Sequence, residues 1–296
     1  MLRLYYRPAR LVLQQSPAGV AGRGRALRLG VIGYGAIVRQ ALACLASEGA
    51  SLEALICLTR EGSGGRAAQA LEAFRGSLAS EVLIVDSLSQ FIAARPGLVA
   101  EAAGHEAVRE CAPSLLMSGV DVLLVSAGAL ADQSLHDSLN VAAGRSGARW
   151  SVCCGAVGGL DILAAAKLAG LQEVVYASRK PPLAWRGTPA ERLVDLASLK
   201  DAQVFYEGDA RAAARDYPQN ANVAATIALA GAGFERTRVR LIADPLAMRN
   251  VHEIRIRSAC ADISIEIAGH PAPDNPKTSL TTGFALAAEI IREHFL

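Results

Sequence analysis

The feature that most constrains the fold is an apolar run that breaks into two glycines near the start of the chain. The run Leu27–Ile32 has the composition of a buried strand, Gly33 and Gly35 follow it, and a helix-forming segment comes next. Gly33 permits a tight turn, and Gly35 lets the backbone approach a pyrophosphate that meets the free N–H groups of the helix. The pattern therefore predicts a dinucleotide site. Its predicted contacts are Gly33, Gly35, Ala36 and Ile37.

The residues after the second predicted strand, at 53–58, bear on which dinucleotide binds. Folds that prefer NAD carry an acid at this place, where it binds the ribose 2′-hydroxyl. This chain has Thr59 and Arg60 instead. A guanidinium suits a 2′-phosphate, so Arg60 predicts that NADP is accepted and leaves NAD open as a cofactor. The competing interpretation is that Arg60 is a solvated loop residue.

Short apolar segments alternate with helix-forming ones through the first half of the chain. This alternation predicts an α/β fold, with a Rossmann-type, doubly wound parallel sheet and helices on both faces. The predicted strands are 27–32, 53–58, 82–85, 98–102, 121–125 and 149–153, and the predicted helices lie near 36–47, 66–75, 87–94, 106–117 and 132–145. Ligands bind at the carboxyl ends of such strands, where His105, Ser126 and Ala129 fall. We therefore count Ala129 among the cofactor-site candidates.

The pattern changes after about residue 153. A helix begins with the glycine-rich segment Gly155–Asp161, and several of the later β-type runs alternate apolar with polar residues. These runs are 173–179, 202–206, 237–242, 252–258 and 262–267, and further helices are predicted near 219–230 and 278–294. Alternation predicts a mostly antiparallel sheet with one solvated face. We therefore expect a first domain over 27–152 and a second, α+β domain over 153–275.

Charge and cysteine content exclude several classes of function. Residues 1–28 hold six arginines and no acid, whereas the remaining 268 residues hold 24 basic and 28 acidic side chains. Without a general basic field, we expect no nucleic-acid partner. The sequence contains no run of eighteen apolar residues, so we expect no membrane span. The six cysteines form no C-x-x-C pair, which predicts reduced thiols in the cytoplasm and no metal site.

The basic start, residues 1–26, admits three interpretations. It is acid-poor and lacks the apolar core of a secretory signal. A transit peptide and a misassigned start are both compatible with it. We favour a disordered extension.

Six short segments, found in a fixed order, resemble the L-aspartate dehydrogenase family. They are Gly155–Asp161, Ser178–Pro182, Asn220–Thr226, Ala243–Pro245, Asn250–Ile254 and Asn275–Ser279. The resemblance implies NAD- or NADP-dependent oxidation of L-aspartate to iminoaspartate, which hydrolyses to oxaloacetate and ammonia or feeds quinolinate synthesis. It also implies a homodimer, with a C-terminal helix near 276–296 that docks back on the first domain. Val38, where the family usually has glycine, and the basic start are departures.

The resemblance assigns the active-site histidine to His252 and cofactor contacts to Ala156 and Asn222. An imidazole at the start of an alternating strand can take a proton from an amine or a water near neutral pH. The plainer alternative is a hydrogen-bonded histidine without a chemical role. His105, after a glycine at the end of a strand, is the second candidate for the base.

A dicarboxylate substrate needs cations and helix N–H groups. We expect Lys277 and Thr278 to supply both at the start of the last helix, and Arg179, next to Lys180, to be a second candidate. Each of these residues also fits a solvated surface position.

Two other functions compete with an aspartate dehydrogenase. An imine reductase similar to dihydrodipicolinate reductase would carry a segment of the type H-H-x-x-K-x-D, and the sequence has none. A dinucleotide sensor without catalysis would lack an acid or base, which His252 argues against.

Overall fold

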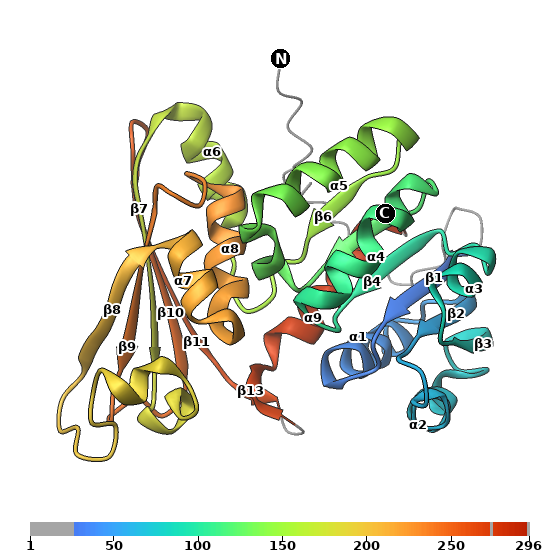
Figure 1. Ribbon diagram of the computed structural model, residues 1–296, viewed down its shortest axis with the longest axis horizontal. Helices are drawn as coiled ribbons and strands as arrows, with labels where there is room; N and C mark the ends of the chain where they lie inside the picture. Colours follow the sequence, from blue (N-terminus) through green and yellow to red (C-terminus); the bar gives the residue numbers. More distant parts are fainter. Residues whose placement is uncertain (1–26, 273–274, 295–296) are drawn as a thin grey trace. The chain divides into compact units, whose positions relative to one another are not determined.

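The computed structural model describes residues 27–272 and 275–294, and the chain divides into two compact units (Figure 1). The first unit contains the described residues up to Cys153, together with the C-terminal segment from Thr282. The second unit contains Cys154–Thr281. Each unit is built around its own sheet.

The first unit is a parallel six-stranded sheet in the order β3-β2-β1-β4-β5-β6. The strands are β1 Leu27–Ile32, β2 Leu52–Leu58, β3 Ala79–Val85, β4 Leu98–Glu101, β5 Asp121–Leu124 and β6 Trp150–Val152. The direction of winding reverses between β1 and β4, where ligands bind in sheets of this kind. The predicted Rossmann-type fold is confirmed.

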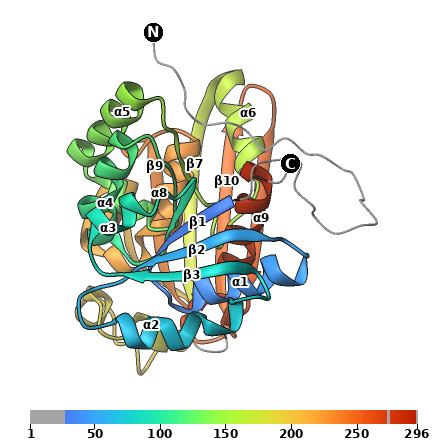
Figure 2. The same cartoon turned by 90° about the vertical axis from the view of Figure 1, so that its right-hand side faces the viewer.

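Helices cover both faces of this sheet. They are α1 Ala36–Ser47, α2 Gly64–Leu71, α3 Leu88–Ala93, α4 His105–Met117 and α5 Gln133–Ser146, with short 3₁₀ turns η1 Glu72–Phe74 and η2 Ala127–Ala131. The apolar core on one face joins α1 and α2 to β1 and β2, and Val38 is buried in it. In Figure 2, α1 and α9 lie to one side of β1–β3, and α3, α4 and α5 lie to the other.

The last helix, α9 Thr281–His294, belongs to the first unit. Its buried side chains Leu286, Ala287 and Ile290 join the same core as α1. A Cβ atom added at Gly283 would lie 2.5 Å from Gln40 Oε1, so the two helices approach closely there. The C-terminal helix therefore packs on the dinucleotide-type sheet.

The second unit contains a five-stranded sheet in the order β11-β10-β7-β9-β8, antiparallel except for the β7–β9 pair. Its strands are β7 Leu171–Lys180, β8 Gln203–Asp209, β9 Thr237–Ala243, β10 Asn250–Ser258 and β11 Asp262–Gly269. Its helices are α6 Leu160–Gly170, α7 Ala210–Asp216 and α8 Ala221–Ala230, with 3₁₀ turns η3 Pro182–Trp185, η4 Pro189–Arg192 and η5 Pro218–Asn220. The expected mostly antiparallel sheet is confirmed.

The two faces of this second sheet differ sharply. Along β10, His252, Ile254 and Ile256 are buried, while the residues between them turn to the other face. Figure 1 shows α6, α7 and α8 on one side of the sheet, and α6 packs on β10. The opposite face carries charged pairs such as Arg257 with Glu173, whose Nε–Oε2 distance is 3.2 Å. The alternation in the sequence reflects this division.

One predicted element needs correction, and one helix was not predicted. The last helix begins at Thr281, and residues expected near its start form strand β13 Asn275–Ser279, paired with β12 Pro271–Ala272. A proline at position 276 favours extended backbone in the residue before it, which suits a strand. Helix α7 was not predicted from the sequence. Asp209 caps it by accepting a hydrogen bond of 2.7 Å from Ala212 N.

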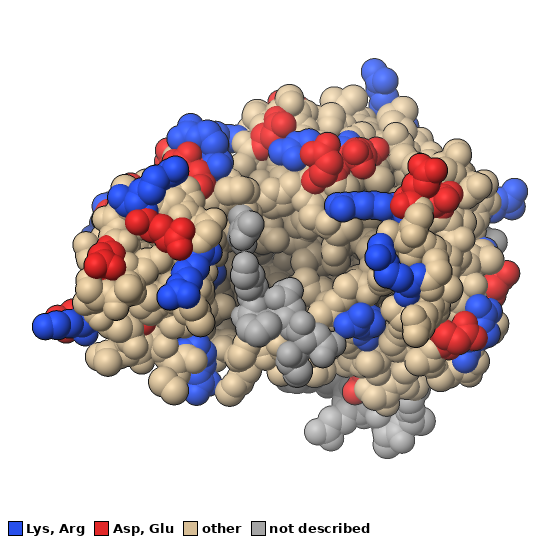
Figure 3. All heavy atoms as spheres, turned by 60° about the horizontal axis from the view of Figure 1, so that its bottom comes forward, with Lys and Arg blue, Asp and Glu red and all other residues tan. Residues whose placement is uncertain are grey.

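Two surface properties bear on possible partners. Of the helices in the described part of the chain, none has the length and apolar character needed to cross a membrane. On the face drawn in Figure 3, the basic and acidic side chains are intermixed, without one large basic patch.

Candidate active site

The glycine turn forms an open cradle at the carboxyl end of β1. Gly33 has a φ of +91°, and its N–H donates to Leu58 O at 3.2 Å. Gly35 is the N-cap of α1, and no side chain caps the helix there. A Cβ atom added at Gly35 would meet nothing within 4 Å. Open space therefore adjoins the helix N–H groups, which fits a pyrophosphate. Ala36 and Ile37 begin the helix.

Arg60 lies where the sequence placed it, just after β2. Thr59 N donates to Val85 O at 2.9 Å, which fixes the end of the strand. Arg60 itself is exposed, and its carbonyl accepts from Ser63 N at 3.0 Å in the loop before α2. Its binding to a 2′-phosphate stays a prediction.

Glu101, which the sequence analysis did not select, organises the next two loops of the first unit. It ends β4 fully buried, and its Oε1 accepts from Ala103 N at 2.7 Å and Gly104 N at 2.9 Å. Ser126, after β5, donates from its hydroxyl to Oε1 at 2.9 Å and from its backbone N–H to Oε2 at 3.1 Å. Burial raises the pKa of Glu101, and these hydrogen bonds oppose the rise. An acid at the end of an apolar strand was the available signal.

The other candidates of the first unit lie in these same loops. His105 begins α4 directly after Gly104. Ala129 lies buried in η2, after Ser126. The structure therefore brings both to the carboxyl ends of β4 and β5, as predicted.

In the second unit, His252 is buried beside a tyrosine. Only 5% of its surface is exposed, and its Nδ1 lies 2.8 Å from the hydroxyl oxygen of Tyr176 on β7. The two rings stack at 6.0 Å between centroids. Burial raises the pKa of Tyr176, and Ser178 also bonds its hydroxyl. The tyrosine therefore keeps its proton and fixes the orientation of the imidazole.

The charge of His252 is controlled by its surroundings. Burial, followed by the positive charge of Lys180, lowers the pKa of His252 to about 4. The imidazole is therefore neutral at physiological pH and able to accept a proton, the state that a general base requires. The sequence identified the residue but not this environment.

Lys180, at the end of β7, is the cation on the same side of the sheet as His252. The side chain is half-buried, and Nζ lies 4.9 Å from the centroid of the Trp185 ring. Nζ also donates a hydrogen bond to Asn220 Oδ1. Asn220 is the N-cap residue of α8, but its side chain makes no capping bond.

Arg179 points to the opposite face of the sheet. Its guanidinium donates to Glu253 Oε1 at 2.9 Å and to Asp244 Oδ2 at 3.1 Å. Because side chains alternate along a strand, adjacent residues of β7 face opposite ways. The structure thus argues against the suggested substrate role of Arg179 and directs attention to Lys180.

The remaining predicted residues occupy separate places in the second unit. Ala156 is buried in the turn before α6, where Val157 N donates to Cys154 O at 3.3 Å. Asn222 lies in the first turn of α8. Lys277 and Thr278 lie in strand β13, so the expected helix N-terminus is absent at these two residues. The helix-based argument for their binding a substrate was wrong.

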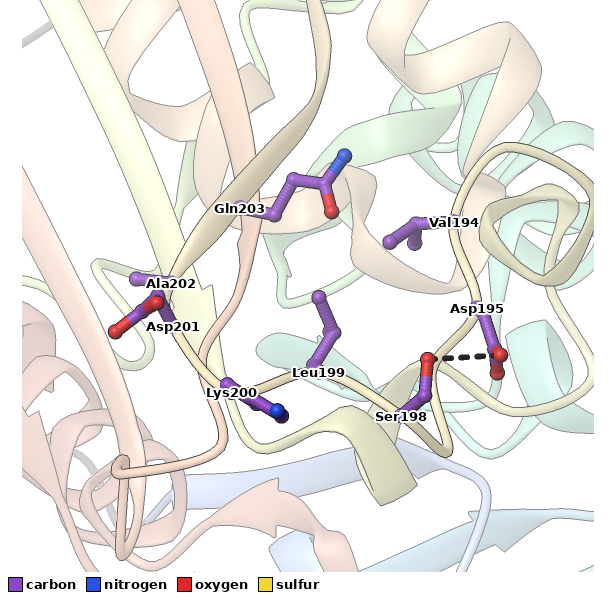
Figure 4. A pocket seen from close by; sticks show the side chains of 8 residues that line it. All are labelled: Val194, Asp195, Ser198, Leu199, Lys200, Asp201, Ala202 and Gln203. Atoms are coloured by element: carbon purple, nitrogen blue, oxygen red, sulfur yellow. Dashed lines mark hydrogen bonds between the residues drawn. The ribbon is translucent and has the colours of Figure 1, made fainter.

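A cavity of about 460 Å³ lies in the loop before β8, away from these residues. It is lined by Val194, Asp195, Ser198, Leu199, Lys200, Asp201, Ala202 and Gln203. Figure 4 shows these side chains, with the Ser198 hydroxyl donating to Asp195 at 2.8 Å. Neither His252 nor Lys180 lines it, so we do not assign it to the reaction. Within the described ranges, no cluster of three His, Cys, Asp or Glu residues is placed to hold a metal ion.

The chain is similar to known dehydrogenases over nearly all of its length. A family model described as aspartate dehydrogenase, C-terminal, matches residues 161–293, and one described as homoserine dehydrogenase, NAD binding domain, matches residues 33–153. L-aspartate dehydrogenase 2 of Bordetella pertussis is 42% identical over 265 residues, which are 90% of this chain and 96% of that protein. The chain belongs to the L-aspartate dehydrogenase family.

Further matches agree with this membership. The L-aspartate dehydrogenase of Cupriavidus taiwanensis is 48% identical over 192 residues, 65% of this chain and 72% of that protein. The crystal structure of aspartate dehydrogenase from Thermotoga maritima superimposes with a TM-score of 0.67 at 25% identity, covering 91% of this chain and 95% of that one. As a member of this family, the chain is an oxidoreductase, and its first unit is an NAD(P)-binding domain. This membership disfavours the dihydrodipicolinate-reductase-like alternative.

Proposed function

We propose that the chain oxidises L-aspartate to iminoaspartate with NAD or NADP, and that the imine is hydrolysed to oxaloacetate and ammonia. The observation that carries the proposal is His252, a buried and neutral imidazole near the start of β10 in the second sheet. Relatives that match this chain over most of its length are L-aspartate dehydrogenases, which supports the choice of substrate.

His252 acts as the general base in this proposal. The α-amine of the substrate must be neutral to push electrons into the forming C=N bond. A nicotinamide cofactor, when bound, would supply the acceptor for the hydride that leaves the α-carbon. Nε2 of His252 removes the proton from the substrate ammonium, or from the water that attacks the imine carbon. General-base catalysis contributes about 10²- to 10⁴-fold to such steps.

Tyr176 and Ser178 set the tautomer that this role needs. When Nδ1–H of His252 donates to the hydroxyl oxygen of Tyr176, Nε2 keeps its lone pair. Hydrogen bonds to the second nitrogen commonly decide which nitrogen of a histidine reacts. The neighbouring strand β7 thus supplies a positioning pair for the base on β10.

The cofactor contacts are proposed in two groups. Gly33, Gly35 and the first turn of α1 hold the pyrophosphate, and Arg60 binds a 2′-phosphate when NADP is the cofactor. The correspondence with the family supports contacts at Ala156 and Asn222, and the position of Ala129 in the turn after β5 supports a contact there.

The biological setting is also part of the proposal. We propose a homodimer formed by the second unit, supported by the sheet face that its helices leave uncovered, with its charged pairs such as Arg257 and Glu173. We further propose a cytoplasmic location, and that the iminoaspartate product can feed quinolinate synthesis.

The direct test is absorbance at the reduced-nicotinamide band. Purified protein is mixed at alkaline pH with NAD⁺ or NADP⁺ and a panel of L-amino acids that includes L-aspartate, L-asparagine and L-glutamate. We expect turnover with L-aspartate, together with release of ammonia. Cofactor binding without turnover of any amino acid would favour the sensor alternative.

A further inference from the structure

Side chains alternate between the two faces of β7, so every second residue points to the same face. Three such residues lie beside His252. These are Tyr176, Ser178 and Lys180, which share the face that the helices cover. His252 is directly opposite Ser178 in the register of β7 and β10. Lys180 is therefore its diagonal neighbour, and diagonal neighbours lie about 7–8 Å apart, with a somewhat shorter distance between their Cβ atoms. One small substrate can contact both side chains.

The ammonium of Lys180 is held in place by neutral groups. Trp185 is fully buried, and its Nε1 donates to Ile242 O at 3.1 Å, which fixes the ring over which Nζ lies. Asn220 accepts one hydrogen bond from Nζ. An ammonium has three donors, so this arrangement leaves donors for a ligand.

In the described part of the chain, Lys180 has no counter-ion, in contrast to its neighbour. Arg179 contacts two carboxylates, Glu253 and Asp244, whereas none of the carboxylates in the described part of the chain forms an ion pair with Lys180. Removing a charge from water without a partner is costly. Burial lowers the pKa of Lys180 to about 8, so it still carries its charge at neutral pH.

We propose that Lys180, positioned by Trp185 and Asn220, binds a carboxylate of the dicarboxylic amino acid whose amine faces His252. The inference rests on the proposed function and adds the residue that selects an acidic substrate. The carboxylate supplies a counter-ion that none of the residues described in the structure provides to Lys180. Lys180 thereby replaces Arg179 as the substrate-binding cation.

The test compares wild type with Lys180→Met, Lys180→Arg and Lys167→Met. Lys167 is an exposed lysine of the same unit, on α6, and Lys167→Met is the matched control. Steady-state kinetics give KM and kcat for L-aspartate, and calorimetry gives the Kd of succinate, an unreactive dicarboxylate, in the presence of NADH. We expect Lys180→Met to raise KM and Kd by about 10- to 100-fold, the range of a hydrogen bond to a charged group.

The conservative variant Lys180→Arg distinguishes a loss of carboxylate binding from a structural effect of the substitution. Lys180→Arg should recover part of the lost affinity because it keeps the charge, whereas Lys167→Met should stay within about twofold of wild type. If Lys180→Met does not fold, Asn220→Ala, which removes the hydrogen bond to Nζ, should still raise the Kd of succinate by about 3- to 10-fold.

Failure of this inference and failure of the proposed function look different. Wild type that binds succinate but oxidises no L-aspartate contradicts the function, and the lysine site is then judged by the Kd values alone. Unchanged KM and succinate Kd in folded Lys180→Met would overturn the inference, as would a loss of affinity that Lys180→Arg does not relieve.

Discussion

The glycine cradle of the first unit and the histidine site of the second unit are built in opposite ways. The cradle is local, because Gly33, Gly35 and the start of α1 follow one another in the chain. The histidine site joins distant segments: His252 and Tyr176 are 76 residues apart. A local site can be predicted from a short pattern, whereas a site made by strand pairing depends on register.

The two sites also use different electrostatics. The cradle offers backbone N–H groups and a helix dipole, which need no buried charge. The histidine site instead takes a titratable ring and a lysine out of water, which shifts the pKa of both side chains downward. We therefore expect changes in the cradle to affect cofactor binding, and changes at the histidine site to affect chemistry and pH dependence.

The largest effect should come from filling the cradle. Gly35→Val adds carbon atoms to the space expected for the pyrophosphate, and we expect cofactor affinity to fall by at least about a hundredfold. The backbone at Gly35 is extended, with φ −69° and ψ −175°, so valine should fit without strain. NADH fluorescence titration measures the loss. Gly144→Val, on the exposed surface of α5, is the control, and unchanged affinity in Gly35→Val would remove the cradle from the site.

The second effect concerns pH and stability. Folding lowers the pKa of His252 from 6.5 to about 4, so between these values the unfolded chain takes up a proton that the folded chain does not. Stability should therefore fall as the pH drops through this window, by up to about 3 kcal/mol from this one group. Urea unfolding of the second unit, followed by Trp185 fluorescence in a Trp150→Phe background, measures the change.

His252→Gln supplies the comparison for this pH dependence. The variant has no titrating ring, so its stability should change less between the two pH values than that of wild type. Equal slopes for the two proteins would show that the imidazole is not kept neutral by the fold.

A smaller and more selective effect is expected at Arg60. Arg60→Ala should weaken NADPH binding by about 1.5–3 kcal/mol, the range of a hydrogen bond to a charged group, and leave NADH binding nearly unchanged. Arg145→Ala, another exposed arginine of the first unit, serves as the control. Equal losses of affinity for NADPH and NADH would show that Arg60 does not bind the 2′-phosphate.

The local features were predicted well from the sequence, whereas the contacts between residues far apart in the chain were predicted poorly. Strand 27–32 and helix 36–47 were predicted with the bounds that the structure has. The choice between Arg179 and Lys180 required knowing which face of β7 the helices cover, and polarity did not decide it because both faces of this strand carry polar residues. Asn220 directly precedes helix α8, but the partner of its side chain is a lysine 40 residues away. Short-range patterns cannot encode such partners.

The buried acid of the first unit shows the same limit. Glu101 ends an apolar strand. That signal is present in the sequence, but it does not show whether the carboxylate is buried or exposed. Its role becomes visible only when β4 and β5 lie side by side and Ser126 reaches its carboxylate.

Turnover and cofactor binding of His252→Ala, measured on the same folded sample, test the central claim most directly. We predict that kcat for L-aspartate falls by at least about a hundredfold, because a general base is lost, while the Kd of NADH stays close to that of wild type. Near-normal turnover in the folded variant would contradict the account and make His105 the candidate base.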